Sequence, residues 1–212
     1  MTGVLRAVVL RDLRLESAAP ETTMVTVSFV IAAVLLAGLA FGPVPATLRD
    51  VGPGTIWLVA LLATAPQARA VSAAERDEGA WDLVRSLVAP TTLLLGKLLS
   101  LWVRLAATWA LTAVLVASVF AFDLPARAWL AGALATLGLA AVTVILGVMV
   151  SGRGGSALLT TLLLPLGLPL LLAGTVLTTP DAPGGPWFAV LVGFDLLLLA
   201  AAWATFPILL EE

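Results

Sequence analysis

The chain has 212 residues, of which 61% are hydrophobic and only 11% are charged, whereas about a quarter of the residues in an ordinary soluble domain are charged. It contains no cysteine and no histidine, which excludes disulfide bonds, thiolate chemistry and most protein ligands of zinc, iron and copper. The composition predicts a membrane protein with almost no sequence left for a soluble domain. We expect no catalytic residues and no metal site.

The first part of the chain, residues 1–21, is too charged to be a cleaved signal peptide. Arg11 and Arg14 are three residues apart and share one face of a helix. We expect this segment to form a helix on the membrane surface, which Pro20 ends before the first span.

Six long apolar stretches follow, each close to the roughly 20 residues that cross a bilayer core as a helix. They predict an all-α membrane protein, one domain over residues 1–212, in which residues 42–53 and 179–186 form loops rich in glycine and proline. The expected spans are residues 24–42, 54–73, 94–122, 127–150, 156–178 and 187–209.

The distribution of Lys and Arg predicts that both termini are cytoplasmic, because positive residues gather on the cytoplasmic side of a membrane. With that orientation only Arg49 and Arg127 lie outside, and Arg104 falls within the third span and is not counted. The residues that then lie on the cytoplasmic side are Arg6, Arg11, Arg14, Arg69, Arg76, Arg85, Lys97 and Arg153.

Three tryptophans support the same orientation, because they open the second, fourth and sixth spans on the outer side. These are Trp57, Trp129 and Trp187. Tryptophan is enriched at membrane interfaces, so we expect an aromatic belt, with stacking against a ligand as the alternative.

The connection between the second and third spans, residues 75–90, concentrates charge in an apolar chain. On a helix, Trp81 and Val84 share an apolar stripe, and Asp82 and Arg85 share a polar one. We expect a short amphipathic helix against the membrane whose acidic front suits a soluble protein better than anionic lipid. An ordinary solvated helix is the alternative. The candidate contact residues are Glu75, Asp77, Glu78, Gly79, Trp81, Asp82 and Arg85.

The fifth span contains Pro165, Gly167 and Pro169. Because each proline removes a backbone hydrogen bond, we expect a bent or broken helix. It acts either as a hinge or as a static kink.

Arg104 and Asp195 are the ionisable residues placed deepest in the spans, which makes both candidates for function. Arg104 is close enough to the cytoplasmic side to extend its side chain there. Asp195 lies about 12 Å in from the outer side at 1.5 Å per residue. The two can pair only if their spans are neighbours.

Three stretches resemble, in order and spacing, the heme exporter protein B family (CcmB), which supplies the membrane subunit of an ABC transporter in cytochrome c maturation. They are "GPGTIW" (52–57), "ERDEGAWDLVRSLVAPTTLLLGKLL" (75–99) and "GRGGSALLTTLLLPLGLPLLLAG" (152–174). The resemblance implies an architecture like that of ABC-2-type permeases and a location in the cytoplasmic, or inner, membrane of a bacterium. It also implies that 75–90 is a coupling helix in a cleft of the ATPase, with Glu78 and Gly79 at the family's acid-Gly pair.

ATP must be bound by another subunit, because Gly96-Lys97 lacks the upstream glycine of a P-loop. The resemblance implies a second copy of the chain, a CcmA-like ATPase, CcmC-like and CcmD-like membrane subunits and a CcmE-like heme chaperone, in membrane lipid and without nucleic acid. Heme is the species handled. Its axial ligands must come from partners, because the chain lacks His, Cys and Tyr. The alternatives are an exporter of a lipid, drug or glycan, and a membrane-embedded lipid-modifying enzyme.

Overall fold

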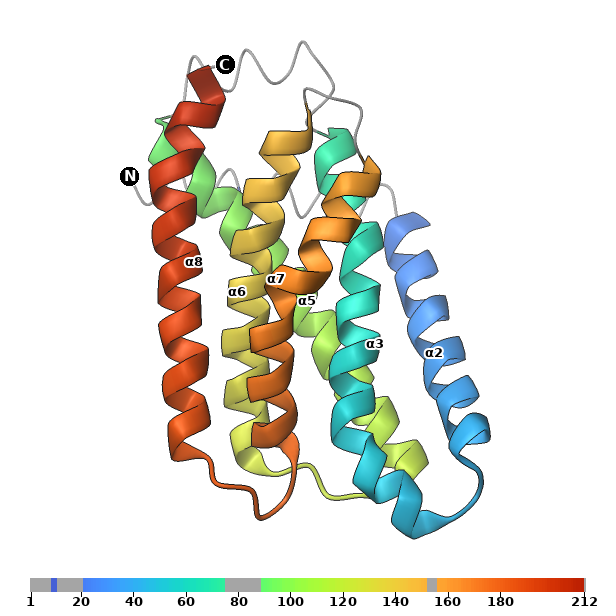
Figure 1. Ribbon diagram of the computed structural model, residues 1–212. Coiled ribbons are helices and arrows are strands. Elements are labelled where there is room, and N and C mark those ends of the chain that lie inside the picture. Colours follow the sequence, from blue (N-terminus) through green and yellow to red (C-terminus); the bar gives the residue numbers. More distant parts are fainter. Residues whose placement is uncertain (1–8, 11–20, 75–88, 152–155, 212) are drawn as a thin grey trace.

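A computed structural model describes residues 9–10, 21–74, 89–151 and 156–211, and within them every long element is a helix. Each of six helices is long and apolar enough to cross a membrane, so the predicted all-α, six-span fold is confirmed. The surface helix predicted within residues 1–21 lies outside the described residues except for 9–10. The helices, which form one bundle (Figure 1), are α2 (Glu21–Phe41), α3 (Pro45–Ala74), α5 (Pro90–Phe120), α6 (Ala126–Ser151), α7 (Ser156–Thr178) and α8 (Gly185–Glu211).

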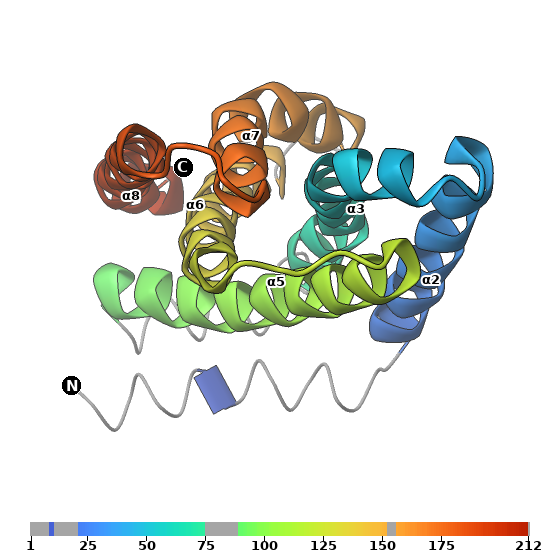
Figure 2. The same cartoon turned by 90° about the horizontal axis from the view of Figure 1, so that it is seen from below.

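α6 occupies the middle of the bundle, and α2 and α8 lie at opposite edges (Figures 1 and 2). α6 contacts α3, α5, α7 and α8. Its buried face is rich in alanine, including Ala128, Ala131 and Ala135. Small side chains let neighbouring helix backbones approach closely, which drives helix packing in membranes.

α5 has 31 residues, so it is about 46 Å long, against about 30 Å for the bilayer core. It fits because it crosses the back of the bundle obliquely (Figure 1). It ends at Ala121, which adopts the left-handed conformation (φ 52°) and whose N–H bonds to the Ala117 carbonyl.

α3 begins at Pro45, so the predicted loop over residues 42–53 is wrong for all but its first three residues. Proline fits the first turn of a helix, where its missing N–H has no partner to lose. The first turns of α3 run across the end of the bundle before the helix turns into it (Figure 2), and Pro53 lies within it. Proline therefore bends this helix instead of preventing it.

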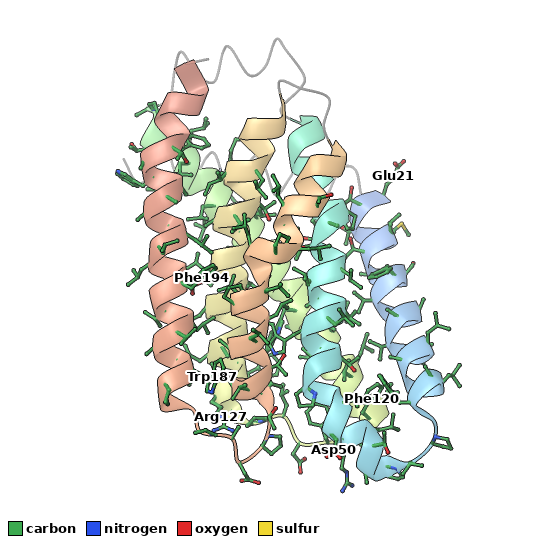
Figure 3. All side chains as sticks on the ribbon, viewed as in Figure 1. Glu21, Asp50, Phe120, Arg127, Trp187 and Phe194 are labelled. Carbon is green, nitrogen blue, oxygen red and sulfur yellow. The ribbon has the colours of Figure 1, made fainter. Side chains whose placement is uncertain are left out.

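The two ends of the bundle differ in what they carry. The connections α2–α3, α5–α6 and α7–α8 lie at the end that holds Asp50 and Arg127, and Glu21 lies at the opposite end (Figure 3). We call the first the Arg127 end. We call the second the Pro90 end, after the first residue of α5.

Candidate functional site

The segment that carries most of the predicted site, residues 75–88, lies outside the described residues. The roles of Glu75, Asp77, Glu78, Gly79, Trp81, Asp82 and Arg85 therefore stay predictions. The structure does describe the two ends that the segment joins, because α3 ends at Ala74 and α5 begins at Pro90. Ala89 precedes α5 in an extended conformation (φ −58°, ψ 138°), as the residue before a proline prefers.

α3 and α5, which flank this segment, are hydrogen-bonded to each other within the bundle. The Gln67 side-chain amide donates to Thr108 Oγ1 over 2.8 Å and to the Ala63 carbonyl over 3.4 Å. Thr108 in turn donates to the Arg104 carbonyl over 3.0 Å. Gln67 is buried, and its Oε1 has no hydrogen-bond partner among the described residues. This bond holds the last turns of α3 to α5.

α7 contains the three predicted hinge residues and is bent but not broken (Figure 1). Pro165 and Pro169 both lie inside the continuous helix. Between them, the backbone of Gly167 approaches two other helices. A Cβ atom on Gly167 would lie 3.1 Å from Leu61 Cδ1 of α3 and 3.3 Å from Leu139 Cδ2 of α6. The glycine therefore allows α7 to pack closely at its bend.

The half of α7 beyond the bend, toward the Arg127 end, is tied to α3. Trp57 Nε1 donates to Thr178 Oγ1 over 2.9 Å, and the Thr178 hydroxyl donates to the Gly174 carbonyl over 2.8 Å. The indole of Trp57 lies against the backbone of Gly174, where a Cβ atom would overlap the ring. Exposed leucines lie along the bend and on both sides of it: Leu162 and Leu164 before Pro165, Leu166 and Leu168 between the prolines, and Leu172 beyond them.

Arg127, near the start of α6, also holds the end of α7. Its guanidinium donates to three carbonyls of α7 and the following loop: Leu177 over 3.1 Å, Thr179 over 2.6 Å and Ala182 over 2.7 Å. The carbonyls of a helix's last turn have no partner within the helix. A cation that bonds to them also interacts favourably with the negative end of the helix dipole.

The predicted aromatic belt is wrong for Trp57. Only 1% of its surface is exposed, because it packs in the bundle between α3 and α7. Trp129 is 46% exposed and Trp187 is partly exposed, as a belt would require. Buried Trp109 of α5 contacts both the buried Trp57 and the exposed Trp129, since its ring centroid is 5.6 Å from each of theirs.

The two intramembrane charges do not pair in this structure. Asp195 is only 3% exposed, and neither of its carboxylate oxygens has a hydrogen-bond partner among the described residues. Its Oδ1 lies so close to the backbone of Gly138 in α6 that a Cβ atom there would overlap it. Arg104 is partly exposed on α5.

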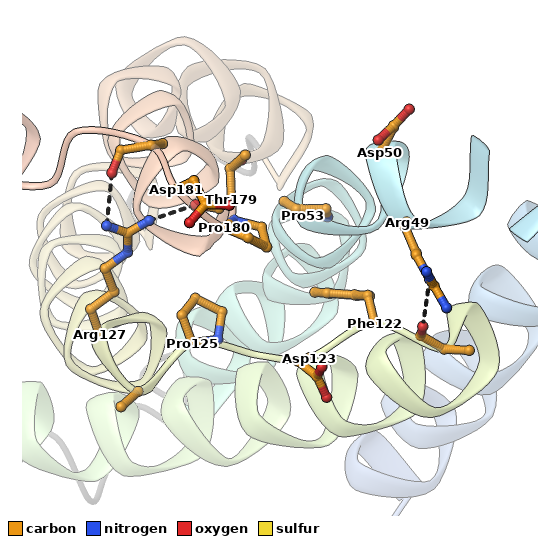
Figure 4. A pocket seen from close by; sticks show the side chains of 13 residues that line it. Arg49, Asp50, Pro53, Phe122, Asp123, Pro125, Arg127, Thr179, Pro180 and Asp181 are labelled. Carbon is orange, nitrogen blue, oxygen red and sulfur yellow. Dashed lines mark hydrogen bonds between the residues drawn. The ribbon is translucent and has the colours of Figure 1, made fainter. Parts of the chain in front are cut away.

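A hollow of about 960 Å³ opens at the Arg127 end, between the first turns of α3 and the α5–α6 and α7–α8 connections (Figure 4). Two arginines border it. Arg49 Nε donates to the Ala121 carbonyl over 3.0 Å, and Arg127 bonds to the carbonyls at the end of α7. The ring of Phe122 packs on Gly52, within 2.6 Å of where its Cβ atom would be. α5 is thereby held to α3 beside the hollow.

The acidic residues around this hollow, Asp50, Asp123 and Asp181, are exposed. No ion pair joins any of them to Arg49 or Arg127 in the described part of the chain, because both guanidiniums bond to backbone carbonyls instead (Figure 4). Sequence reasoning did not identify this hollow. Its residues come from the first turns of α3 and from two connections far apart in the sequence, and the signal in the sequence was the pair of arginines outside the positive cytoplasmic set.

Comparison with known proteins identifies the family. The sequence profile described as "CcmB protein" matches residues 3–209. The chain belongs to the CcmB family. It is 28% identical over 201 residues to the heme exporter protein B of Paracoccus denitrificans, with 92% of each chain covered. It is 30% identical over 206 residues to that of Bradyrhizobium diazoefficiens, covering 92% of this chain and 91% of the relative.

A third CcmB relative, the heme exporter protein B of Rhodobacter capsulatus, is 30% identical over 185 residues, covering 85% of this chain and 84% of the relative. The resemblance drawn from residues 52–57, 75–99 and 152–174 is therefore confirmed. The six-helix CcmB bundle described above spans nearly the whole matched region.

Proposed function

We propose that this CcmB-family chain is the membrane subunit of an ABC transporter. In it, ATP hydrolysis by a separate subunit drives heme export, or the release of a heme-loaded chaperone, during cytochrome c maturation. The observation that carries the proposal is the family match over residues 3–209, together with three relatives named heme exporter protein B. The chain acts as a transport component, and catalysis belongs to the ATPase.

In this proposal the ATPase acts on the bundle through residues 75–88. The segment joins α3 to α5, and the Gln67–Thr108 hydrogen bond ties those two helices together within the bundle. A push on the segment therefore moves α3 and α5 as a pair. Because α3 continues to the Arg127 end and borders the hollow there, the same movement reaches the opposite face.

α7 supplies the hinge. Its half beyond Pro169 is held by hydrogen bonds from Trp57 and Arg127. A helix fixed on one side of two prolines bends most easily at the prolines, which lack backbone hydrogen bonds. We assign to Pro165, Gly167 and Pro169 the bending that accompanies each ATPase cycle.

The Lys and Arg distribution supports a cytoplasmic Pro90 end and an outer Arg127 end. The hollow then faces the side on which cytochrome c is assembled. Because the chain has no His, Cys or Tyr, heme iron in the complex is ligated by other subunits. The proposed partners are a second copy of the chain, the ATPase, CcmC-like and CcmD-like subunits and a CcmE-like chaperone.

The test combines a deletion strain with purification. Deleting the gene should abolish covalent heme attachment to c-type cytochromes, and a tagged copy should restore it and co-purify with an ATPase subunit from the same membranes. A copy of that ATPase with its P-loop lysine replaced should co-purify but not restore maturation. Normal cytochrome c levels in the deletion strain would contradict the proposal and favour export of a lipid, drug or glycan.

A further inference from the structure

The proposed transport function assigns no role to the carboxyl group of Asp195. Asp195 lies ten residues into α8, about 15 Å from the start of the helix, and Gly138 lies twelve residues into α6, about 18 Å from its start. Both are therefore near the middle of a bilayer core about 30 Å thick. A carboxyl group at this depth is expensive unless it is paired or neutral.

Among the described residues, neither a cation nor a hydrogen-bond donor is bonded to the carboxyl group of Asp195. A Cβ atom on Gly138 would overlap Asp195 Oδ1 and would lie 2.9 Å from Leu170 Cδ1 of α7, so the carboxyl group and Leu170 both lie close to the Gly138 backbone. The two buried hydroxyls of α6 nearest to Gly138 in sequence donate to carbonyls of their own helix: Thr136 to Gly132 and Thr143 to Leu139.

α8 packs against three helices, α5, α6 and α7. The charged side chains of these helices do not bond to Asp195 either. α6 carries only Arg127, about 16 Å along the helix from Gly138, and it bonds to the α7–α8 connection. α7 carries none, and α5 carries Lys97 and Arg104. Neither oxygen of Asp195 bonds to any of these side chains.

We propose that Asp195 is a proton-binding site in the seam between α6 and α8, and that loss of its proton loosens the packing of α8 on α6. The neutral acid suits the apolar notch formed by Gly138 and Leu170. The ionised carboxylate would be an unpartnered charge at the centre of the membrane, and only separation of the two helices would bring water to it. This site does not depend on the transport function proposed above.

Carbodiimides test the proposal directly, because only a protonated carboxyl starts their reaction. The acid proton goes to one nitrogen of dicyclohexylcarbodiimide, the carboxylate oxygen adds to its central carbon, and the adduct rearranges to a stable N-acylurea with no leaving group. We expect this apolar reagent to modify Asp195 of the full chain in native membranes near neutral pH. The modification should fall about tenfold per pH unit once the group ionises.

The chain supplies its own controls. Exposed Asp123 and Asp181 should react with a water-soluble carbodiimide plus glycine ethyl ester, whereas Asp195 should not. Mass spectrometry of peptides distinguishes the three sites. Absence of the N-acylurea on Asp195 at neutral and acidic pH, in membranes where Asp123 and Asp181 are labelled, would overturn the proposal.

A second measurement addresses the packing. Asp195→Asn keeps the shape of the neutral acid but cannot ionise. In lipid nanodiscs the wild type should lose stability toward unfolding as the pH is raised through the ionisation, and the variant should lose less. The quantity compared is the change in unfolding stability per pH unit in the wild type and in the variant. Absolute stabilities are not compared, since the buried amide lowers the stability of the variant at every pH. Equal slopes would show that no proton at Asp195 controls the packing.

Discussion

Trp57 of α3 and Thr178 of α7 form a buried hydrogen bond, with 2.9 Å between Nε1 and Oγ1. The same hydroxyl donates to the Gly174 carbonyl one turn earlier, and the indole lies flat enough on α7 that only glycine fits beneath it. The three groups form one contact between helices. Its parts should therefore fail together when any one is changed.

Gly174→Ala should destabilise the bundle by about 1–3 kcal/mol, because the new methyl group overlaps the Trp57 ring and forces overpacking. The measurement is the free energy of unfolding in mixed micelles. Gly193→Ala in α8 is the matched control, since a Cβ atom there meets nothing within 4 Å. It should leave stability unchanged or slightly improved, because alanine favours the helix.

Trp57→Leu provides the complementary change, since it removes both the ring and the donor. In this background Gly174→Ala should cost much less, giving a coupling energy of about 1 kcal/mol or more in the double-mutant cycle. If the two changes are additive, the indole does not rest on Gly174 and the contact between α3 and α7 is not as described.

Sequence alone predicted the spans but misread Trp57. A tryptophan at the start of an apolar stretch is usually an interface anchor, and the glycine- and proline-rich residues 42–53 were expected to form a loop, which placed the start of the second span at residue 54. The helix in fact begins at Pro45, which puts Trp57 more than three turns inside it. Periodicity could not show this, because a membrane helix is apolar on the lipid side and on the buried side alike.

The hollow and Asp195 show a second limit of sequence reasoning. Arg49, Arg127 and Asp195 were all visible as charges, but their partners are backbone carbonyls of other helices or no described group at all. The sequence cannot reveal a backbone carbonyl as a partner, because every residue has one whatever its side chain. The depth of Asp195 was predictable from spacing, whereas its contact with Gly138 required the packing of α8 on α6.

Arg127→Gln should lower the stability of the α7–α8 connection, because one amide cannot replace three bonds from a guanidinium fork. We expect a loss of about 1.5–3 kcal/mol, as for hydrogen bonds to charged groups. Faster proteolytic cleavage within residues 179–184, at equal expression, is the measurement.

Arg49→Gln is the control for Arg127. Arg49 is exposed and makes one described bond, to the Ala121 carbonyl, so its loss should cost under about 1 kcal/mol. A larger effect of Arg49→Gln than of Arg127→Gln would reverse the ranking of the two arginines derived from the structure.

The orientation of the chain is tested by single cysteines, which are unambiguous because the chain has none. Cysteines at Thr47, Ala126 and Ala182, all at the Arg127 end, should react with an impermeant maleimide in intact cells. One at Ser72, near the end of α3, should react only after the membrane is opened. Reaction of Ser72 alone in intact cells would place the Arg127 end in the cytoplasm.

Heme bound to the purified chain alone should lack a defined axial ligand from the protein. His, Cys and Tyr are absent, and Met24 is 67% exposed on the outer surface of α2, where lipid surrounds it. The visible absorption spectrum should be that of weakly ligated heme and should be unchanged by Met24→Leu or Met149→Leu. A sharp six-coordinate spectrum lost in either variant would contradict the assignment of heme ligation to other subunits.

The last prediction concerns Gly79 in the proposed coupling segment. Gly79→Trp adds the largest side chain where the family resemblance places the contact with the ATPase, so it should reduce ATPase co-purification at least about tenfold, or about 1.4 kcal/mol. Cytochrome c maturation should fall with it. Membrane abundance and maleimide labelling at Ala126 should not change, because Gly79 falls in the sequence between α3 and α5 and the substitution alters no residue of the six described helices.

Two further variants separate docking from folding in this segment. Gly79→Ala adds one methyl group and should retain most of the ATPase, since a cleft that accepts a helix has more tolerance for a methyl than for an indole. Trp81→Ala removes the apolar anchor and should instead make the segment more sensitive to protease in membranes without ATPase. If Gly79→Trp keeps wild-type ATPase association and cytochrome c yield, residues 75–88 form a surface helix only, and the route from ATP to α3 and α5 must begin elsewhere.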